Sequence, residues 1–447
     1  MQLVAYGAQD IYLTGNPQIT FFKVVYRRHT NFSMESIVQT FSGSADFGGD
    51  VVATISRNGD LVHRMYLEHD AVWTNTGDSG ANMGLVERYG DSLIKECEIE
   101  IGGQRIDKHT SMWNRVYSDL TEYNPSGYFG GAVAPVAGTA MVASNGTLHQ
   151  LMTGNGYGVT SAEDTTPAFS VIDNATVNGF TYEDGASANG IITVNKIFLP
   201  LNFWFNRNPG LALPLIALQY HEVKVKMTFE THANLARNVH DSGNALLNVA
   251  ITSAFAATPT LNLWCDYIYL DTDERRRFAQ VSHEYLIEQL QFSDHTVDTQ
   301  NPSIDLNFNH PVKELIWCTQ NTGTKGRNGA ADSDAGGSTT RDPTAGPVTL
   351  SGMGGNWQLK LNGHDRFKER DSKYFTRTQV WQHHTGYGAL QTSGCVVDDG
   401  DLDADASYDT AQLCGADSIA VYSFALKPEE HQPSGTCNFS RIDNAQL

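Results

Sequence analysis

An internal duplication constrains this chain more than any other feature of its sequence. Four segments of the first half recur, weakly but in the same order, in the second half. The pairs are 32–41 with 283–292, 57–61 with 309–315, 98–105 with 358–366, and 198–210 with 421–435. Since all four matches keep one order, the sequence predicts two copies of one unit, roughly 200 residues each, joined near 271–274.

Several segments alternate apolar and polar residues, which is the period of a strand that is buried on one face. The clearest are ECEIEI at 96–101, LNLWCDYIYL at 261–270, HEVKVKMTF at 221–229 and QLKL at 358–361. Gly-Gly follows the first of these and Asn-Gly follows the last, as expected for hairpin turns. Helical periodicity is scarce, so both units are predicted to be all-β.

The charge and hydropathy of the chain limit what it binds. A net charge of −20 disfavours direct contact with nucleic acid or with an anionic membrane surface. The apolar run at 211–218 is far shorter than the roughly 20 residues that span a bilayer, and prolines interrupt the stretch around it. The N-terminus lacks the basic-then-apolar layout of a signal peptide, so we expect a soluble protein.

Cysteine usage and low-complexity stretches complete this outline. Six scattered cysteines form no C-x-x-C pair, so we expect reduced thiols in a cytosolic setting. Polar, glycine-rich stretches at 124–195, 321–347 and 385–417 are predicted to be surface loops. The first unit continues for two strands beyond Gly210, whereas only 436–447 follow Gly435, so we expect the second unit to lack its last strands.

Residues that could carry chemistry have simpler interpretations. The basic clusters YRRH at 26–29 and ERRR at 274–277 could contact DNA or lipid, but salt bridging within or between subunits is the favoured interpretation. The acidic stretch 398–405 lacks the Gly and Glu of a calcium loop and is interpreted as a solvated loop. Adjacent His383 and His384 would face opposite sides of a strand and could not chelate together. We assign no catalytic, cofactor-binding or metal-ligating residue.

Six blocks of the sequence resemble the major capsid proteins of nucleocytoplasmic large DNA viruses, nearest to those of the algal, chlorella-virus-like members. The resemblance covers essentially the whole chain except the variable loops. The blocks are GAQDIYLTGNPQITFFKVVYRRHTNF at 7–32, RNGDL at 57–61, EIEIGGQRIDKH at 98–109, FWFNRNPGLALPLIALQYHEV at 203–223, LDTDERRRFAQVSHEYLIEQLQF at 270–292 and PSGTCNFSRIDNA at 433–445.

The resemblance implies an all-β fold of two tandem eight-stranded antiparallel jelly rolls, a double jelly roll with long surface loops. An arm at 1–20 would lie under the capsomer and tie it to its neighbours. The first jelly roll would span 21–270 with its loop at 124–195, followed by a linker at 271–280 and a second jelly roll at 281–447 without its last strands. The proline-containing stretch 208–223 then becomes a turn and buried linker that enters a strand at His221.

The implied function is structural, with no catalysis and no cofactor. The chain would form homotrimers with a pseudo-hexagonal outline that tile the icosahedral outer shell of a virion, assembled in the host cytoplasm. Its partners would be other copies, neighbouring capsomers and minor capsid proteins, with an internal membrane contacted only indirectly and no direct nucleic acid. Glycans could be attached covalently, and the sequon residues Asn145 and Asn174 are the candidates.

An alternative of another class is a jelly-roll carbohydrate-binding protein on the virion surface. Such a protein would need a shallow groove lined by aromatic side chains. Trp73, Trp113 and Trp381 lie outside the repeated segments and could line it.

Overall fold

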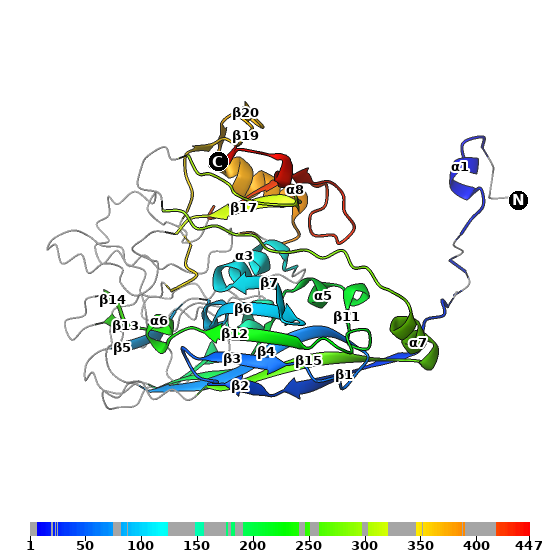
Figure 1. Cartoon of the computed structure of the whole chain (residues 1–447). Coiled ribbons are helices and arrows are strands. Elements are labelled where there is room, and N and C mark those ends of the chain that lie inside the picture. Colours follow the sequence, from blue (N-terminus) through cyan, green and yellow to red (C-terminus); the bar gives the residue numbers. More distant parts are fainter. Residues whose placement is uncertain are drawn as a thin grey trace, which may run out of the picture.

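Two β-rich units and a projecting N-terminal arm make up the chain (Figure 1). The computed structural model describes residues 7–18, 21–22, 24, 26–74, 82–86, 88–123, 148–155, 176–177, 180–183, 191–240, 246–250, 259–296, 303–320, 346–350, 352–386, 388 and 417–447. Within them antiparallel strands dominate and helices are short, so the prediction of an all-β chain is confirmed. None of the helices in these ranges is long and apolar enough to cross a membrane.

The larger sheet of the first unit has seven strands, all paired antiparallel. Its long central strand pairs on one side with the strand that closes the unit, and the first strand of the unit lies at the sheet edge. In spatial order the strands are β1 (Phe32–Gln39), β15 (Thr260–Leu270), β4 (Leu61–Thr74), β10 (Ile191–Pro200), β9 (Phe180–Glu183) and β8 (Thr176–Val177), with β11 (Leu213–Pro214) also on β4.

A five-stranded sheet faces the first one, and the two sheets form the layers of a jelly roll (Figure 1). Its strands, in spatial order, are β2 (Phe41–Gly43), β3 (Asp50–Thr54), β12 (Val223–Phe229), β6 (Ile94–Ile101) and β7 (Gln104–Thr110). Along β12 every second side chain, from Val223 to Phe229, is buried. The period-two pattern therefore predicted this strand correctly, because one of its faces lines the core.

The main hydrophobic core lies between the two sheets. Its largest fully buried side chains are Trp73, Tyr89, Tyr267, Phe203, Phe205 and Phe229. The stretch 208–223 reaches this core through Leu211, Leu213 and Leu215, after one 3-10 turn, η1 (Pro209–Leu211). Its part 211–215 is thus a buried linker after a turn, as expected where proline excludes a continuing helix. The rest differs from the expectation, since 216–222 is half-buried or exposed and the strand begins at Val223 rather than at His221.

Short elements surround the sandwich. A three-stranded sheet is made by β5 (Asn82–Leu85), β13 (Ala236–His240) and β14 (Leu246–Ala250). The helices are α1 (Ile11–Thr14), α2 (Tyr89–Leu93), α3 (Ser111–Thr121), α4 (Leu148–Thr153), α5 (Trp204–Arg207), α6 (His232–Leu235) and α7 (Thr272–Gln280).

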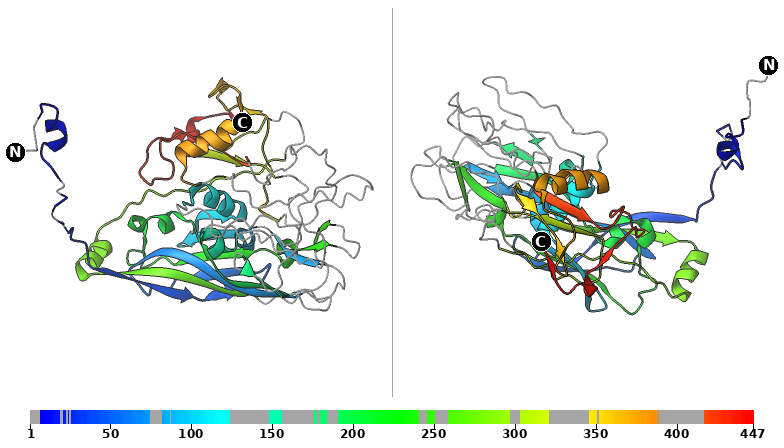
Figure 2. Two further views of the ribbon diagram at one scale, coloured as in Figure 1. Left: turned by 180° about the vertical axis from the view of Figure 1, so that it is seen from behind. Right: turned by 90° about the horizontal axis from the view of Figure 1, so that it is seen from above.

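The second unit packs short strands around an aromatic core (Figure 2). Trp317, Trp357, Phe367, Phe375 and Tyr422 contact one another there. The pairs are β16 (Pro311–Val312) with β23 (Cys437–Asn438), β17 (Glu314–Cys318) with β22 (Ile419–Ser423), and β18 (Asn356–Trp357) with β21 (Arg370–Asp371). A three-stranded sheet has β20 (His364–Asp365), β19 (Lys360–Leu361) and β24 (Ala445–Gln446), and the helical turns are η2 (Tyr374–Thr378), α8 (Gln379–His383) and η5 (Phe439–Arg441).

Two expectations for this unit differ from the structure. The QLKL pattern yields only the two-residue strand β19. The segment 283–292, which the repeat matches to β1, is extended but pairs with no strand in the described part of the chain. Instead, its Gln289 side chain donates to the Ile106 carbonyl at 2.5 Å and the Leu290 N–H donates to Asp107 Oδ1 at 3.2 Å. Bonds to the β7 edge thus replace a strand ladder.

The linker expected at 271–280 contains α7. Asp271 caps it, its side chain accepting from the Thr272 N–H at 2.7 Å, and Asp273 and Glu274 stand in the first turn, where the helix dipole favours negative charge. No residue of α7 is fully buried, although Phe278 packs on a small cluster with Ile268. The helix is therefore specified mainly by its N-terminal residues.

Helix α3 of the first unit joins the two units. Its Val116 and Leu120 are buried against Leu350, Val380 and Val421 of the second unit, within one cluster.

Hydrogen bonds reinforce this junction. The Arg115 guanidinium donates to the Val348 carbonyl at 2.6 Å. At the end of α3, the Leu120 carbonyl accepts from the Gly386 N–H at 2.7 Å and the Thr121 carbonyl accepts from the Thr385 hydroxyl at 3.0 Å. The last carbonyls of the helix are thus satisfied by the other unit.

Substituting Gly386 by Ala should destabilise the junction. A Cβ on Gly386 would lie 2.4 Å from the Asp119 carbonyl oxygen and 2.6 Å from that of Leu120, so backbone must move. We expect Gly386→Ala to lower the free energy of unfolding in urea by about 1–3 kcal/mol. Gly354→Ala is the matched control, since nothing lies within 4 Å of its added Cβ. Equal midpoints for both variants would contradict the role of this contact.

Candidate functional site

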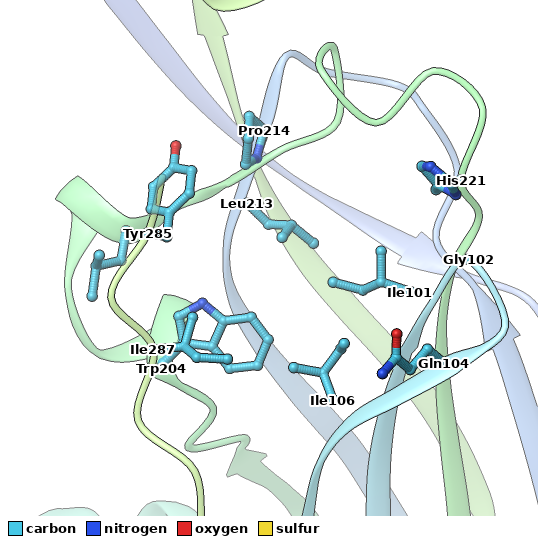
Figure 3. A pocket seen from close by; sticks show the side chains of 11 residues that line it. Ile101, Gly102, Gln104, Ile106, Trp204, Leu213, Pro214, His221, Tyr285 and Ile287 are labelled. Atoms are coloured by element: carbon cyan, nitrogen blue, oxygen red, sulfur yellow. The ribbon is translucent and has the colours of Figure 1, made fainter. Parts of the chain in front are cut away.

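An apolar groove of about 420 Å³ lies at one end of the first jelly roll (Figure 3). Its wall includes the buried side chains of Trp204, Leu211 and Leu213 and the half-buried side chains of Ile101 and Ile106. These residues come from β6, β7, α5, η1 and β11, which all end or turn at this place. The groove is therefore built on rigid elements of the sandwich.

A glycine turn gives the groove its outer rim. Gly102 and Gly103, between β6 and β7, have φ angles of +60° and +85°, which residues with a side chain rarely adopt. The Gly102 N–H donates to the Glu222 carbonyl at 2.9 Å, and a Cβ on Gly102 would lie 2.6 Å from His221 Nδ1. The turn thus packs directly on His221, which with Gln104 forms the polar part of the rim.

The opposite wall comes from the segment that follows α7. Tyr285 and Ile287 line the groove from that side (Figure 3). Their segment is held against β7 by the bonds of Gln289 and Leu290, and Arg207 of α5 pairs with Glu288 at 3.1 Å. The groove therefore lies where the first unit meets the chain that leads into the second.

The N-terminal arm is the second exposed feature, and the name is used from here for everything before β1, which begins at Phe32, so it extends beyond the expected 1–20. Figures 1 and 2 show that it leaves β1 and extends away from both units. Phe21 is 92% exposed and Phe22 is 99% exposed, and Val24 and Tyr26 are also exposed. Solvent-exposed aromatic side chains in such a row indicate a contact that one isolated chain does not make.

A buried charged histidine lies within the second unit, next in sequence to the residue that bonds the end of α3. His384 Nε2 is 2.9 Å from Glu314 Oε2, and His384 Nδ1 is 3.0 Å from Glu429 Oε1. Burial lowers the pKa of His384, but the hydrogen bonds with both carboxylates outweigh burial and raise this pKa to about 9. Thr385, the next residue, bonds both Glu429 and the end of α3.

The sequence-based interpretations of charged residues can now be compared with the structure. Arg275 pairs with buried Asp60 at 2.9 Å, and Arg276 and Arg277 pair within α7, so salt bridging is confirmed for this cluster. Arg27 and Arg28 of the arm are exposed and form no ion pair with other described residues.

The sequence analysis placed His383 and His384 in a strand, but the structure does not. His383 is the last residue of helix α8, and His384 follows it. The two side chains nevertheless have different partners, since His383 contacts the Leu426 carbonyl while His384 contacts carboxylates. Among the described residues no group of His, Cys, Asp or Glu could hold a metal ion.

The remaining candidates are dispersed. Asn145, Asn174 and the acidic stretch 398–405 lie outside the described residues. The three tryptophans proposed for a sugar-binding groove do not meet, because Trp73 lies in the main core and Trp113 is part of α3 and packs on the cluster at the junction, whereas Trp381 is 81% exposed on α8. The apolar groove was missed, since its walls come from distant segments.

Comparison with known proteins establishes the family. The sequence model "Major capsid protein N-terminus" matches residues 20–271, and "Large eukaryotic DNA virus major capsid protein" matches 274–389 and 407–447. The chain belongs to the large eukaryotic DNA virus major capsid proteins. It is 47% identical to the major capsid protein of Pyramimonas orientalis virus, over 100% of this chain and 90% of that protein. The corresponding protein of Paramecium bursaria Chlorella virus 1 is 40% identical, over 100% and 85%.

Solved structures of capsid proteins agree with this assignment. The crystal structure of PBCV-1 VP54, fitted into a reconstruction of the virophage Sputnik, matches with a TM-score of 0.62 and 35% identity, over 96% of this chain and 86% of that one. A quasi-atomic model of the PBCV-1 virus capsid gives 0.61 over the same shares. The Faustovirus major capsid protein, at 12% identity and a TM-score of 0.57, shares the fold. The predicted family and double jelly roll are therefore confirmed.

The pairing of His384 with Glu314 and Glu429, called the His384 clamp below, makes the stability of the protein depend on pH. A pKa raised from 6.5 to about 9 means that the clamp stabilises fully below pH 6.5 and is lost as the pH rises through 9. We expect the wild type to lose up to about 3 kcal/mol of unfolding free energy between pH 6 and pH 9.5 through this group. His384→Gln should flatten that dependence in urea titrations, whereas His383→Gln should retain it. A dependence unchanged in His384→Gln would contradict the clamp.

Proposed function

We propose that three copies of this chain form a capsomer with a pseudo-hexagonal outline, and that such capsomers tile the outer shell of a large DNA virus. One observation carries the proposal: similarity to major capsid proteins extends over both units and the whole chain. The protein in the quasi-atomic model of the PBCV-1 virus capsid has a structure that matches 96% of this chain. Two jelly rolls in each of three copies would supply the six similar corners of such an outline.

The physical properties of the chain support a structural role rather than a catalytic one. The two units are locked through α3, so each copy can act as one building block. A net charge of −20 disfavours direct contact with nucleic acid. We therefore propose other copies, neighbouring capsomers and minor capsid proteins as partners, an indirect relation to an internal membrane, and assembly in the host cytoplasm.

The division of the chain follows from the same proposal. We assign an arm at 1–20, the first jelly roll at 21–270, a linker at 271–280 and the second jelly roll from 281, with 21–31 continuing the arm as far as β1. Covalent glycans remain a proposal at Asn145 and Asn174, which mass spectrometry of peptides from virions would test by their added mass.

The oligomeric state tests the proposed function directly. Light scattering coupled to size exclusion, at physiological salt with a reductant, should give three times 49.0 kDa, about 147 kDa, stable on dilution. A species of 49.0 kDa at every concentration would contradict the capsomer. Glycan binding by such a monomer would then support the carbohydrate-binding alternative.

A further inference from the structure

The aromatic side chains of the arm need a partner surface. Phe21 and Phe22 are almost completely exposed, and in both views the arm that carries them extends away from its own units (Figures 1 and 2). Adjacent phenylalanines in water are unfavourable unless another surface covers them. We therefore expect the arm to bury Phe21 and Phe22 against another surface.

The apolar groove offers such a surface. It is open toward solvent, its walls are mainly aliphatic and aromatic, and its polar residues His221 and Gln104 lie at the rim (Figure 3). Aromatic side chains suit a groove of this kind, because they bury a large area and lose little conformational freedom. One arm and one groove are present in every copy.

Charges beside the groove complement those of the arm. Arg27 and Arg28 follow the aromatic residues and form no ion pair with other described residues. Glu284 is exposed next to Tyr285 and forms no ion pair with other described residues, whereas Glu222, exposed next to His221, is already paired with Lys224 at 3.0 Å. Two cations near this rim also have partners, since Arg105 pairs with Glu98 at 3.3 Å and Arg57 donates to the His221 carbonyl at 3.4 Å. Glu284 is thus the carboxylate that an incoming Arg27 or Arg28 would meet.

We propose that Phe21 and Phe22 of one copy occupy the groove of a second copy of this chain. The proposal rests on the self-association proposed above and names its contact surface. A contact in which each copy gives an arm and receives one is head-to-tail, and such contacts close into a ring when the rotation between copies permits. In a trimer, three arms would fill three grooves.

Cross-linking between differently labelled copies tests the contact. A chain with Phe22→Cys is mixed with a chain with Ile287→Cys, and a short bismaleimide is added. We expect a covalent dimer of the two chains. The matched control replaces Ile287→Cys by Val72→Cys, a similarly exposed position on the outer face of β4, and should give no such dimer. The wild type, with its own cysteines, controls for background.

Other results would overturn the inference. Absence of the mixed dimer, or equal yields with Val72→Cys, would contradict docking in this groove. A chain carrying both Phe22→Cys and Ile287→Cys that cross-links only within itself would show that the arm folds back on its own groove.

Association measurements separate this inference from the proposed function. Replacing both Phe21 and Phe22 by Ser, or Ile287 by Glu, should weaken self-association at least tenfold, whereas Tyr12→Ser, also on the exposed arm, should leave it unchanged. If the wild type forms trimers and the arm and groove variants associate equally well, the docking is wrong while the capsomer stands. If the wild type never associates, the proposed function itself fails.

Discussion

The packing of α3 against the second unit is the interaction on which the arrangement of the whole chain depends. Val116 and Leu120 face residues that are more than 200 positions away in the sequence. The end of the helix would leave its last carbonyls without partners, and the backbone N–H of Gly386 and the hydroxyl of Thr385 supply them. The end of α3 and the junction between the two units therefore stabilise each other.

A buried ionic network behind α3 restricts how the helix can move. Arg88 pairs with Asp119 of α3 and lies 3.6 Å from Asp91, and Arg115 lies 3.7 Å from Asp119. Burial raises the pKa of Asp91 to about 6, despite the neighbouring Arg88. A shift of α3 would separate charges that are out of contact with water, which is costly. The network thus favours one position of the helix and hence one arrangement of the units.

Sequence patterns predicted the first unit well and the second unit less well. In β6, β12 and β15 alternate side chains enter the core, so the hydrophobic pattern is a direct record of burial. Segment 283–292 resembles β1 in sequence, but a strand also needs a neighbouring strand to pair with. In this segment the Gln289 side chain and the Leu290 N–H bond to β7 instead. Helix α7 carries helix-start residues but little apolar periodicity, so a search for core-facing stripes did not find it.

The candidate site shows a different limit of sequence reasoning. Ile101, Leu213 and Ile287 have nothing in common as sequence, and they line one groove only because a turn, a linker and an inter-unit segment meet.

Electrostatics then explains why local surfaces must decide how copies meet. Chains that each carry −20 repel one another, but this repulsion is screened beyond roughly 8 Å at physiological salt. Association therefore depends on contacts at close range, where apolar area is buried and opposite charges meet. The arm combines exposed aromatic residues with Arg27 and Arg28, and the groove combines apolar walls with Glu284 beside it. In the proposed docking, close contacts between arm and groove would offset the weak, screened repulsion between acidic copies.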